Sequence, residues 1–250
     1  MSGHSKWATI RRKKEVTDSK RASAFTKVTR EIIVATKAGG SGDPDHNFRL
    51  RLAVLKAKEI NMPNDNIQRA IKRGLGETES DHYEEVYYEG YAPGGVAVMV
   101  QALTDNRNRT AGEMRYLFSR NNGNLGEAGC VSWMFASKGV IVVDATEAKK
   151  TGDEMFELAI EAGAEDLKAD DETFEIYTEP GQLDAVRKYL EAKKVPLKSV
   201  TLAMIPQNTV EVSGDQAKQA LKLIDALEEN DDVQNVYANF EIPDAELEKL

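Results

Sequence analysis

The apolar residues of this 250-residue chain change their spacing near residues 76–82, and this change limits how the chain can fold. Before this segment, apolar side chains recur every three or four residues, which is the period of an amphipathic helix. After it, apolar and polar residues alternate over short stretches bounded by glycine and proline, which is typical of strands. The segment itself is polar and acidic. We therefore predict a helical domain over residues 1–76, a linker, and then domains of mixed helices and strands.

Three short amphipathic helices are expected in the first domain. The first begins near Thr17 and ends at Gly39, the second covers residues 47–60, and the third begins at Pro63 and ends at Gly74. Proline near a helix start and glycine after a helix end are the usual boundary signals. The residues that these helices turn outward are largely Lys and Arg.

The rest of the chain alternates between the two periods. We expect strands over residues 84–91, 96–103, 131–135, 140–143, 173–177, 200–204, 209–212 and 233–240. We expect helices over residues 108–121, 153–162, 183–192 and 216–229. This order predicts an α+β fold with two ferredoxin-like sandwich domains. Residues 138–205 make a complete unit, whereas 83–137 and 206–241 each make half of one, so the complete unit is predicted to be inserted into the other.

The charge of the chain is divided as sharply as its periodicity. Residues 1–75 contain 17 Lys and Arg against 7 Asp and Glu, a net charge of +10. The remaining 175 residues contain 16 bases and 35 acids, a net charge of −19, although the whole chain has only −9. A polyanion is therefore attracted to the first domain and repelled by most of the rest. This pattern predicts a nucleic-acid partner for the helical domain.

The candidate contacts in that domain combine basic groups with one aromatic ring. Lysine and arginine neutralise phosphates and release counterions, and a tryptophan ring stacks on a base or a ribose. The alternative is a solvated run of charge with the tryptophan packed on its own domain. The predicted contacts are Lys6, Trp7, Arg11, Arg12, Lys13, Lys14, Lys20 and Arg21.

A second group of bases stands out within the acidic part of the chain. Arg107, Arg109, Arg115 and Arg120 are the only Lys or Arg between Gly76 and Ser137. The first two are expected in a loop after a strand, and Arg115 about two turns into the next helix. A loop and a helix start suit a phosphate, because backbone N–H groups and guanidinium groups both point at it. We predict a second nucleic-acid contact at Arg107, Arg109 and Arg115, with ion pairs inside the same domain as the alternative.

Catalytic signals are poor. The three histidines lack the spacing of a zinc site, and the glycine pairs are not followed by the Gly-Lys-Ser/Thr of a phosphate-binding loop. The acidic pairs 170–171 and 231–232 could chelate a divalent ion, but they are expected to be exposed loop acids. No metal, cofactor or enzymatic activity is predicted.

The location is expected to be cytoplasmic. The first residues lead into charge and not into an apolar signal segment, and the apolar runs are too short to span a bilayer. Cys130 is the only cysteine, which excludes a disulfide framework.

Five motifs resemble the YebC/PmpR family. They are SGHSKW at residues 2–7, NFRLR at 47–51, NMPNDNI at 61–67, LTDNRNRT at 103–110 and GCVSWMF at 129–135. The resemblance implies three domains, one helical and basic and two α+β, with the third inserted into the second. It also implies a non-enzymatic regulator, because many bacterial members are described as DNA-binding transcriptional regulators. Others are ribosome-associated translation factors, including mitochondrial translational activators.

Charge and resemblance together predict a nucleic-acid-binding regulator of gene expression, with DNA-directed transcriptional control as the first expectation. A translation factor that binds the ribosome or its RNA is the alternative. Two rival classes stay open: a protein-interaction module in which the acidic domains bind a basic partner, and a metal-dependent nuclease that uses the acidic pairs.

Overall fold

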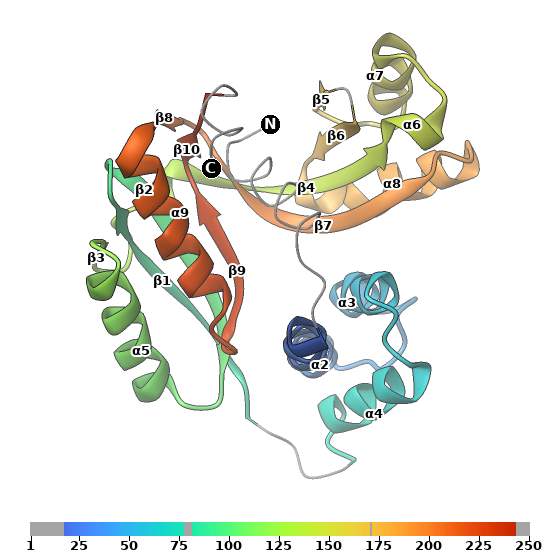
Figure 1. Ribbon diagram of the computed structural model, residues 1–250. Helices are drawn as coiled ribbons and strands as arrows, with labels where there is room; N and C mark the ends of the chain where they lie inside the picture. Colours follow the sequence, from blue (N-terminus) through green and yellow to red (C-terminus); the bar gives the residue numbers. More distant parts are fainter. Residues whose placement is uncertain (1–17, 78–81, 171, 244–250) are drawn as a thin grey trace. The chain divides into compact units, whose positions relative to one another are not determined.

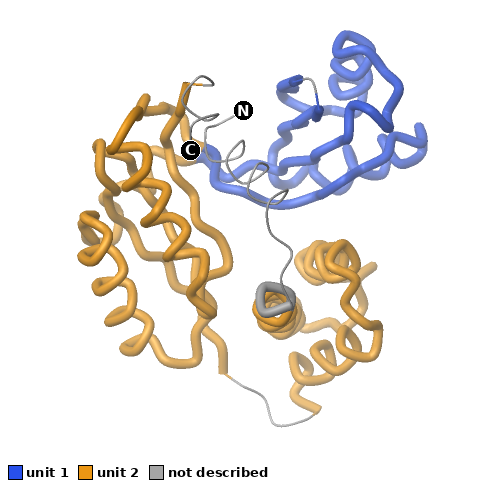
Figure 2. Tube along the Cα trace, in the orientation of Figure 1, with its two compact units in different colours: residues 1, 136–205 blue, residues 2–135, 206–250 orange. Residues whose placement is uncertain are grey.

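The chain folds into two compact units (Figure 2). The structure is a computed structural model that describes residues 18–77, 82–170 and 172–243, without the side chains of residues 18–21. One unit holds Ala136–Ile205, and the other holds Ser2–Phe135 and Pro206–Leu250. The larger unit therefore contains both the helical domain and a domain made from two separate stretches of chain.

The helical domain consists of α2 (Asp18–Gly39), α3 (Phe48–Glu59) and α4 (Asn64–Gly74). Helix α2 contacts both of the others. Their apolar stripes form one core, with Ile32 and Leu50 fully buried and Ile67 almost so. These are the three helices that the apolar spacing predicts.

Buried Asn47 holds the turn between α2 and α3. Its side-chain oxygen accepts the Leu50 N–H at 3.1 Å and so caps α3, and its Nδ2 donates to the Ala35 carbonyl at 2.9 Å. A Cβ on Gly39 would lie within 2.2–2.8 Å of this side chain. Glycine is therefore required there by close approach, since a larger residue would displace the cap.

The second domain of the larger unit is a sheet with two helices on one face (Figure 1). Its strands are β1 (Glu84–Ala92), β2 (Val96–Thr104), β3 (Asn124–Leu125) and β9 (Val233–Ala238), in the order β3-β1-β2-β9. Helices α5 (Arg107–Arg120) and α9 (Gly214–Glu228) contact each other and the sheet. Between them and the strands lies a core that includes Phe118 and Leu223.

The smaller unit has the βαββαβ order of a ferredoxin-like domain. Its elements in chain order are β4 (Phe135–Asp144), α6 (Ala145–Ala148), α7 (Gly152–Glu161), β5 (Asp166–Ala169), β6 (Thr173–Thr178), α8 (Leu183–Ala192) and β7 (Leu197–Pro206). The strands are ordered β5-β6-β4-β7. Short 3₁₀ turns at Ser132–Met134 and Pro180–Gln182 precede β4 and α8. The α+β fold class is thereby confirmed.

One predicted strand is wrong. Residues 131–135 do not form a strand of their own, because a 3₁₀ turn there leads into β4, which includes the predicted strand 140–143. The cause is the buried carboxylate of Glu89, which accepts the backbone N–H groups of Gly129, Val131 and Ser132, each at 2.8 Å. These N–H groups are then unavailable to a strand ladder. The strand β5 also escapes prediction, since its four residues are too few to show a clear alternation and three of them are exposed.

The predicted last strand, residues 233–240, is interrupted at Asn239. Its side chain replaces the backbone carbonyl that a strand partner would supply, because its Oδ1 accepts the Ala97 N–H at 2.7 Å. Beyond it the chain pairs in parallel with β8 (Val210–Glu211) as the separate strand β10 (Phe240–Glu241).

Replacing Glu89 with glutamine is expected to lower the free energy of unfolding by about 2–3 kcal/mol near neutral pH, because a charged acceptor of three N–H groups is lost. Burial raises the pKa of the Glu89 carboxyl, but the hydrogen bonds from the three N–H groups lower it by a larger amount. The net pKa therefore lies below its usual value. This contribution is therefore present above about pH 4.5 and lost as the pH falls through the folded-state pKa. Urea unfolding of Glu89→Gln and of the exposed-site control Glu84→Gln, near pH 7 and near pH 4, measures it. An equal loss at both pH values would contradict the assignment.

Candidate nucleic-acid interface

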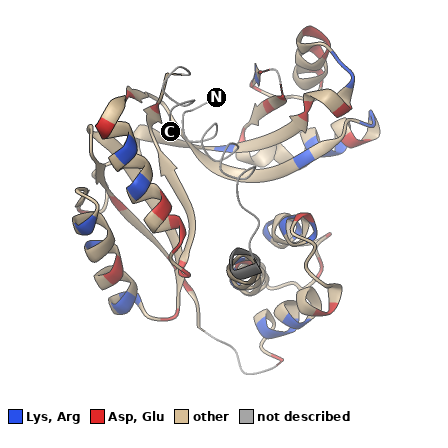
Figure 3. Ribbon diagram, viewed as in Figure 1, with Lys and Arg blue, Asp and Glu red and all other residues tan. Residues whose placement is uncertain are grey.

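Helices α3 and α4 of the helical domain carry several Lys and Arg residues (Figure 3). Arg49 pairs with Glu85 at 2.9 Å, and Lys56 pairs with Glu31 at 2.8 Å. Four other bases are exposed and form no ion pair within the described part of the chain. They are Lys37, Lys58, Arg69 and Lys72. These four side chains are available to a polyanion.

The predicted contacts nearest the N-terminus fall at or before the beginning of α2. Lys20 and Arg21 belong to the first turns of this helix, and their side chains lie outside the described residues. The remaining members of that set also lie outside the described residues: Lys6, Trp7, Arg11, Arg12, Lys13 and Lys14. They stay predictions.

The predicted loop at Arg107 and Arg109 is instead the first turn of α5. Asn106 ends the extended chain with φ −147° and ψ 92°, and its side-chain oxygen accepts the Arg109 N–H at 3.1 Å. This N-cap explains why the helix begins at Arg107. Both arginines therefore lie on a rigid element, on different sides of it.

The three predicted arginines do not form one site. Arg109 is 42% exposed, but its guanidinium is engaged within its own unit, because its Nη2 lies 2.8 Å from carboxylate oxygens of both Asp105 and Asp232. Hydrogen bonding to Asp232 raises the pKa of this guanidinium. Arg107 is 68% exposed and has only Glu84 near it, at 3.6 Å. Arg115 is exposed and has no ion pair among the described residues.

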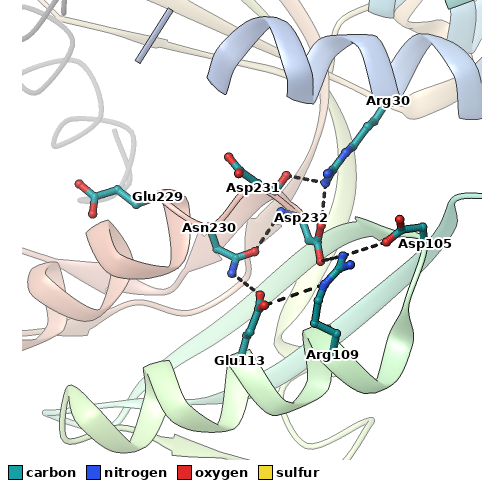
Figure 4. Close-up of a pocket in the computed structure, with 8 residues that line it drawn as sticks. All are labelled: Arg30, Asp105, Arg109, Glu113, Glu229, Asn230, Asp231 and Asp232. Atoms are coloured by element: carbon teal, nitrogen blue, oxygen red, sulfur yellow. Dashed lines mark hydrogen bonds and ion pairs between the residues drawn. The ribbon is translucent and has the colours of Figure 1, made fainter. Parts of the chain in front are cut away.

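Asp232 is the centre of this network (Figure 4). Its side chain is only 5% exposed. One carboxylate oxygen accepts from Arg30 Nη1 at 2.7 Å, and the other accepts from Arg109 Nη2 at 2.8 Å and from Thr110 Oγ1 at 2.6 Å. The expectation that residues 231–232 are exposed loop acids is therefore wrong for Asp232, because the two guanidinium groups compensate its burial. Asp231 is exposed.

An open pocket of about 440 Å³ surrounds these groups. It is lined by Arg30, Asp105, Arg109, Glu113, Glu229, Asn230, Asp231 and Asp232. Five carboxylates face two guanidinium groups, so the pocket repels phosphate. Arg109 consequently serves the internal network, which is the alternative that its sequence position leaves open.

Lys27 and Arg30 are two further basic residues whose side chains bind groups of their own unit. Lys27 Nζ donates to the Glu228 carbonyl at 2.6 Å, and Arg30 Nη1 donates to the Asp231 carbonyl at 2.8 Å. Burial lowers the pKa of Lys27 to about 8. Both residues count toward the basic charge of the first domain, yet they tie α2 to the chain after α9. Charge alone gives no signal that distinguishes them from outward bases.

Both histidines of the described residues lie beside a charged side chain. His46 pairs with Asp43 at 2.8 Å, and His82 lies 3.2 Å from Lys37. No three His, Cys, Asp or Glu side chains of the described part are grouped to hold a metal ion. None of its helices is both long and apolar enough to cross a membrane.

A basic helical domain followed in the chain by two α+β domains defines a multidomain α+β protein whose first 75 residues are positively charged. The N-terminal domain model of the TACO1/YebC proteins matches residues 5–77, and the model of their second and third domains matches residues 83–240. The chain belongs to the TACO1/YebC family. The resemblance carried by the sequence motifs is thereby confirmed.

Relatives match along the whole length. A protein of Natranaerobius thermophilus is 56% identical over 249 residues and covers 99% of each chain. A protein of Geobacter sulfurreducens is 56% identical over 250 residues and covers 100% of each chain. Both are named probable transcriptional regulatory protein. The crystal structure of a conserved hypothetical protein from Aquifex aeolicus has a TM-score of 0.83 and 51% identity, and covers 91% of this chain and 93% of that one.

Removing the charge of Asp232 is expected to destabilise the larger unit. Asp232→Asn leaves two guanidinium groups facing a neutral side chain, and Arg30 Nε already has no hydrogen-bond partner among the described residues. We expect a loss of about 2–4 kcal/mol in the free energy of unfolding, measured by urea denaturation near pH 7. Asp231→Asn is the control, since its carboxylate is exposed. Equal effects of the two substitutions would show that the buried network is not responsible.

The buried Lys27 ammonium is expected to give a distinct pH dependence. Its pKa is about 8 when folded and 10.5 when exposed, so the unfolded chain binds more protons between these values. Stability from this residue therefore rises with pH between about 8 and 10.5. Relative to Lys27→Met, the wild-type protein should gain stability across this window in urea titrations. A difference that falls or stays flat would contradict the burial of the ammonium.

Proposed function

We propose that this protein is a non-enzymatic, nucleic-acid-binding regulator of gene expression that acts in the cytoplasm. The observation that carries the proposal is the net charge of +10 in residues 1–75, against −19 in the rest of the chain. Lys37, Lys58, Arg69 and Lys72 support it, because they are exposed and form no ion pair within the described residues. The names of the relatives, which are probable transcriptional regulatory proteins, point the same way.

The proposed mechanism is electrostatic docking. Basic groups on α3 and α4, with Lys6, Arg11, Arg12, Lys13 and Lys14 before α2, contact phosphates and release counterions. The exposed bases are spread over short helices, so the contacts position the protein on a backbone. The acidic domains repel the polyanion and thereby orient it toward the helical domain.

The target is proposed to be duplex DNA, in keeping with transcriptional control. The internal network supports docking through the outward bases, because it binds Lys27, Arg30 and Arg109 to carboxylates and carbonyls of the same unit. The outward bases then keep a defined direction relative to α2.

The triple variant Lys58→Gln, Arg69→Gln, Lys72→Gln is expected to bind duplex DNA more weakly. Each lost phosphate contact lowers the slope of log K against log salt by about 0.9, so the slope should fall by up to about 3. Fluorescence anisotropy at several KCl concentrations measures this. The matched control is Lys168→Gln, Lys193→Gln, Lys198→Gln, which removes three exposed lysines from the smaller unit. Equal slopes for the two triple variants would refute docking through the helical domain.

Ribosome co-sedimentation from cell lysate separates the two modes of regulation. Transcriptional control predicts a steep salt slope on duplex DNA and no protein in the ribosomal pellet. Pelleting that is lost when residues 1–16 are removed would instead establish a translation factor. Binding to neither target would refute the proposed function as a whole.

A further inference from the structure

Helix α5 exposes a face centred on Gly112. Residues three and four apart lie on the same side of a helix. Arg115 and Tyr116 therefore lie one turn beyond Gly112 on this face, and Arg120 lies one turn beyond Tyr116. All three are exposed. The face is built from two guanidinium groups and one aromatic ring on a single rigid element, whereas Arg107 lies nine positions before Tyr116 and so on the opposite side of the helix.

The acid of this helix borders that face but is engaged elsewhere. Glu113 is the only Asp or Glu in α5, and its carboxylate accepts from Asn230 Nδ2 at 2.8 Å and lies 3.9 Å from Arg109. Within the described part of the chain, neither Arg115 nor Arg120 forms an ion pair. The neighbouring helix α9 adds exposed Lys218 and Lys222, beside exposed Asp215.

Tyr116 gives the face a second chemical character. It is 57% exposed, which is unusual for so large a ring. Arg120 lies against it, with its Nη1 2.7 Å from the hydroxyl oxygen and its guanidinium carbon 5.7 Å from the ring centroid. A phenol ring held by an arginine is a surface on which an unpaired base can stack. Bases inside a duplex are already stacked and cannot reach it.

We propose that the outer face of α5 binds single-stranded nucleic acid, with Arg115 and Arg120 on phosphates and Tyr116 stacked on one base. The proposal rests on the proposed function and adds to it a preference for unpaired strands at a site separate from the helical domain. Charge complementarity favours this occupant over a basic protein, and the isolated ring favours it over a lipid surface, which requires several apolar anchors.

Gly112 offers a test that leaves the fold intact. It precedes Tyr116 by one turn, and a Cβ there would meet no atom within 4 Å. Gly112→Glu therefore places a carboxylate in the middle of the face without a clash, and glutamate is a better helix former than glycine. Gly112→Ala is the matched control, since it adds only a methyl group. Asn208→Glu adds the same charge at an exposed position outside α5.

The experiment measures binding of the full chain to labelled 20-nucleotide oligomers by fluorescence anisotropy over a range of KCl concentrations. The probes are single-stranded RNA, single-stranded DNA of the same sequence, and the duplex. Tyr116→Ala should weaken single-strand binding by roughly 5- to 150-fold, the range that loss of one stacked base produces, with little effect on the duplex. Tyr116→Phe should retain most of the affinity, because the ring is kept.

Gly112→Glu should lower the affinity for single strands by at least about tenfold, whereas Gly112→Ala and Asn208→Glu should stay close to the wild-type protein. A loss confined to RNA or shared by RNA and DNA supports the site in either case and tells which sugar it accepts. Unchanged single-strand binding in both Gly112→Glu and Tyr116→Ala would overturn the proposal. So would equal losses on duplex and single strands.

Failure of this proposal differs from failure of the proposed function. If the triple variant of α3 and α4 loses duplex binding while the α5 variants bind like wild type, only the α5 site is refuted. If the wild-type chain binds none of the three probes near 50 mM salt, where phosphate contacts are strong, both are refuted.

Discussion

The buried carboxylate of Asp232 is the constraint on which the larger unit depends. A carboxylate that is 5% exposed is costly unless positive charges and hydrogen-bond donors surround it. Here Arg30 and Arg109 provide the charges, and Thr110 adds a hydroxyl donor. Burial raises the pKa of Asp232, but the hydrogen bonds from these three residues lower it by a larger amount. The net pKa therefore lies below its usual value. Arg30 comes from α2 and Arg109 from α5. One carboxylate therefore joins the helical domain to the sheet domain within the same unit.

This network divides the basic residues into two groups. Lys27, Arg30 and Arg109 face carbonyls and carboxylates of their own unit, whereas Arg107, Arg115 and the exposed bases of α3 and α4 face solvent. Only the second group can release counterions when a polyanion binds. The larger unit thus has two outward basic surfaces, on the helical domain and on α5, separated in sequence by acidic residues. Their proposed targets differ because α5 carries an exposed ring.

Most of the secondary structure follows from local patterns. The three helices of the first domain, the β1–β2 hairpin and helix α8 begin and end close to where periodicity and turn residues predict. The errors occur where one distant side chain decides. Glu89 holds residues 129–132 out of a strand, and Asn239 interrupts the last strand by bonding Ala97. Periodicity in a single segment does not contain these contacts, because their partners lie 42 and 142 residues away.

The candidate site shows the same division between local pattern and tertiary contact. The sequence by itself determines the charge asymmetry, the fold class and the family motifs, because each depends on residue identity and spacing along the chain. It also places four arginines together between residues 107 and 120. Only the tertiary structure decides that Arg109 turns into an acidic pocket while Arg115 and Arg120 turn out beside Tyr116. The reason is physical: a guanidinium group pairs with the nearest buried carboxylate, and Asp232 is 123 residues away in the chain.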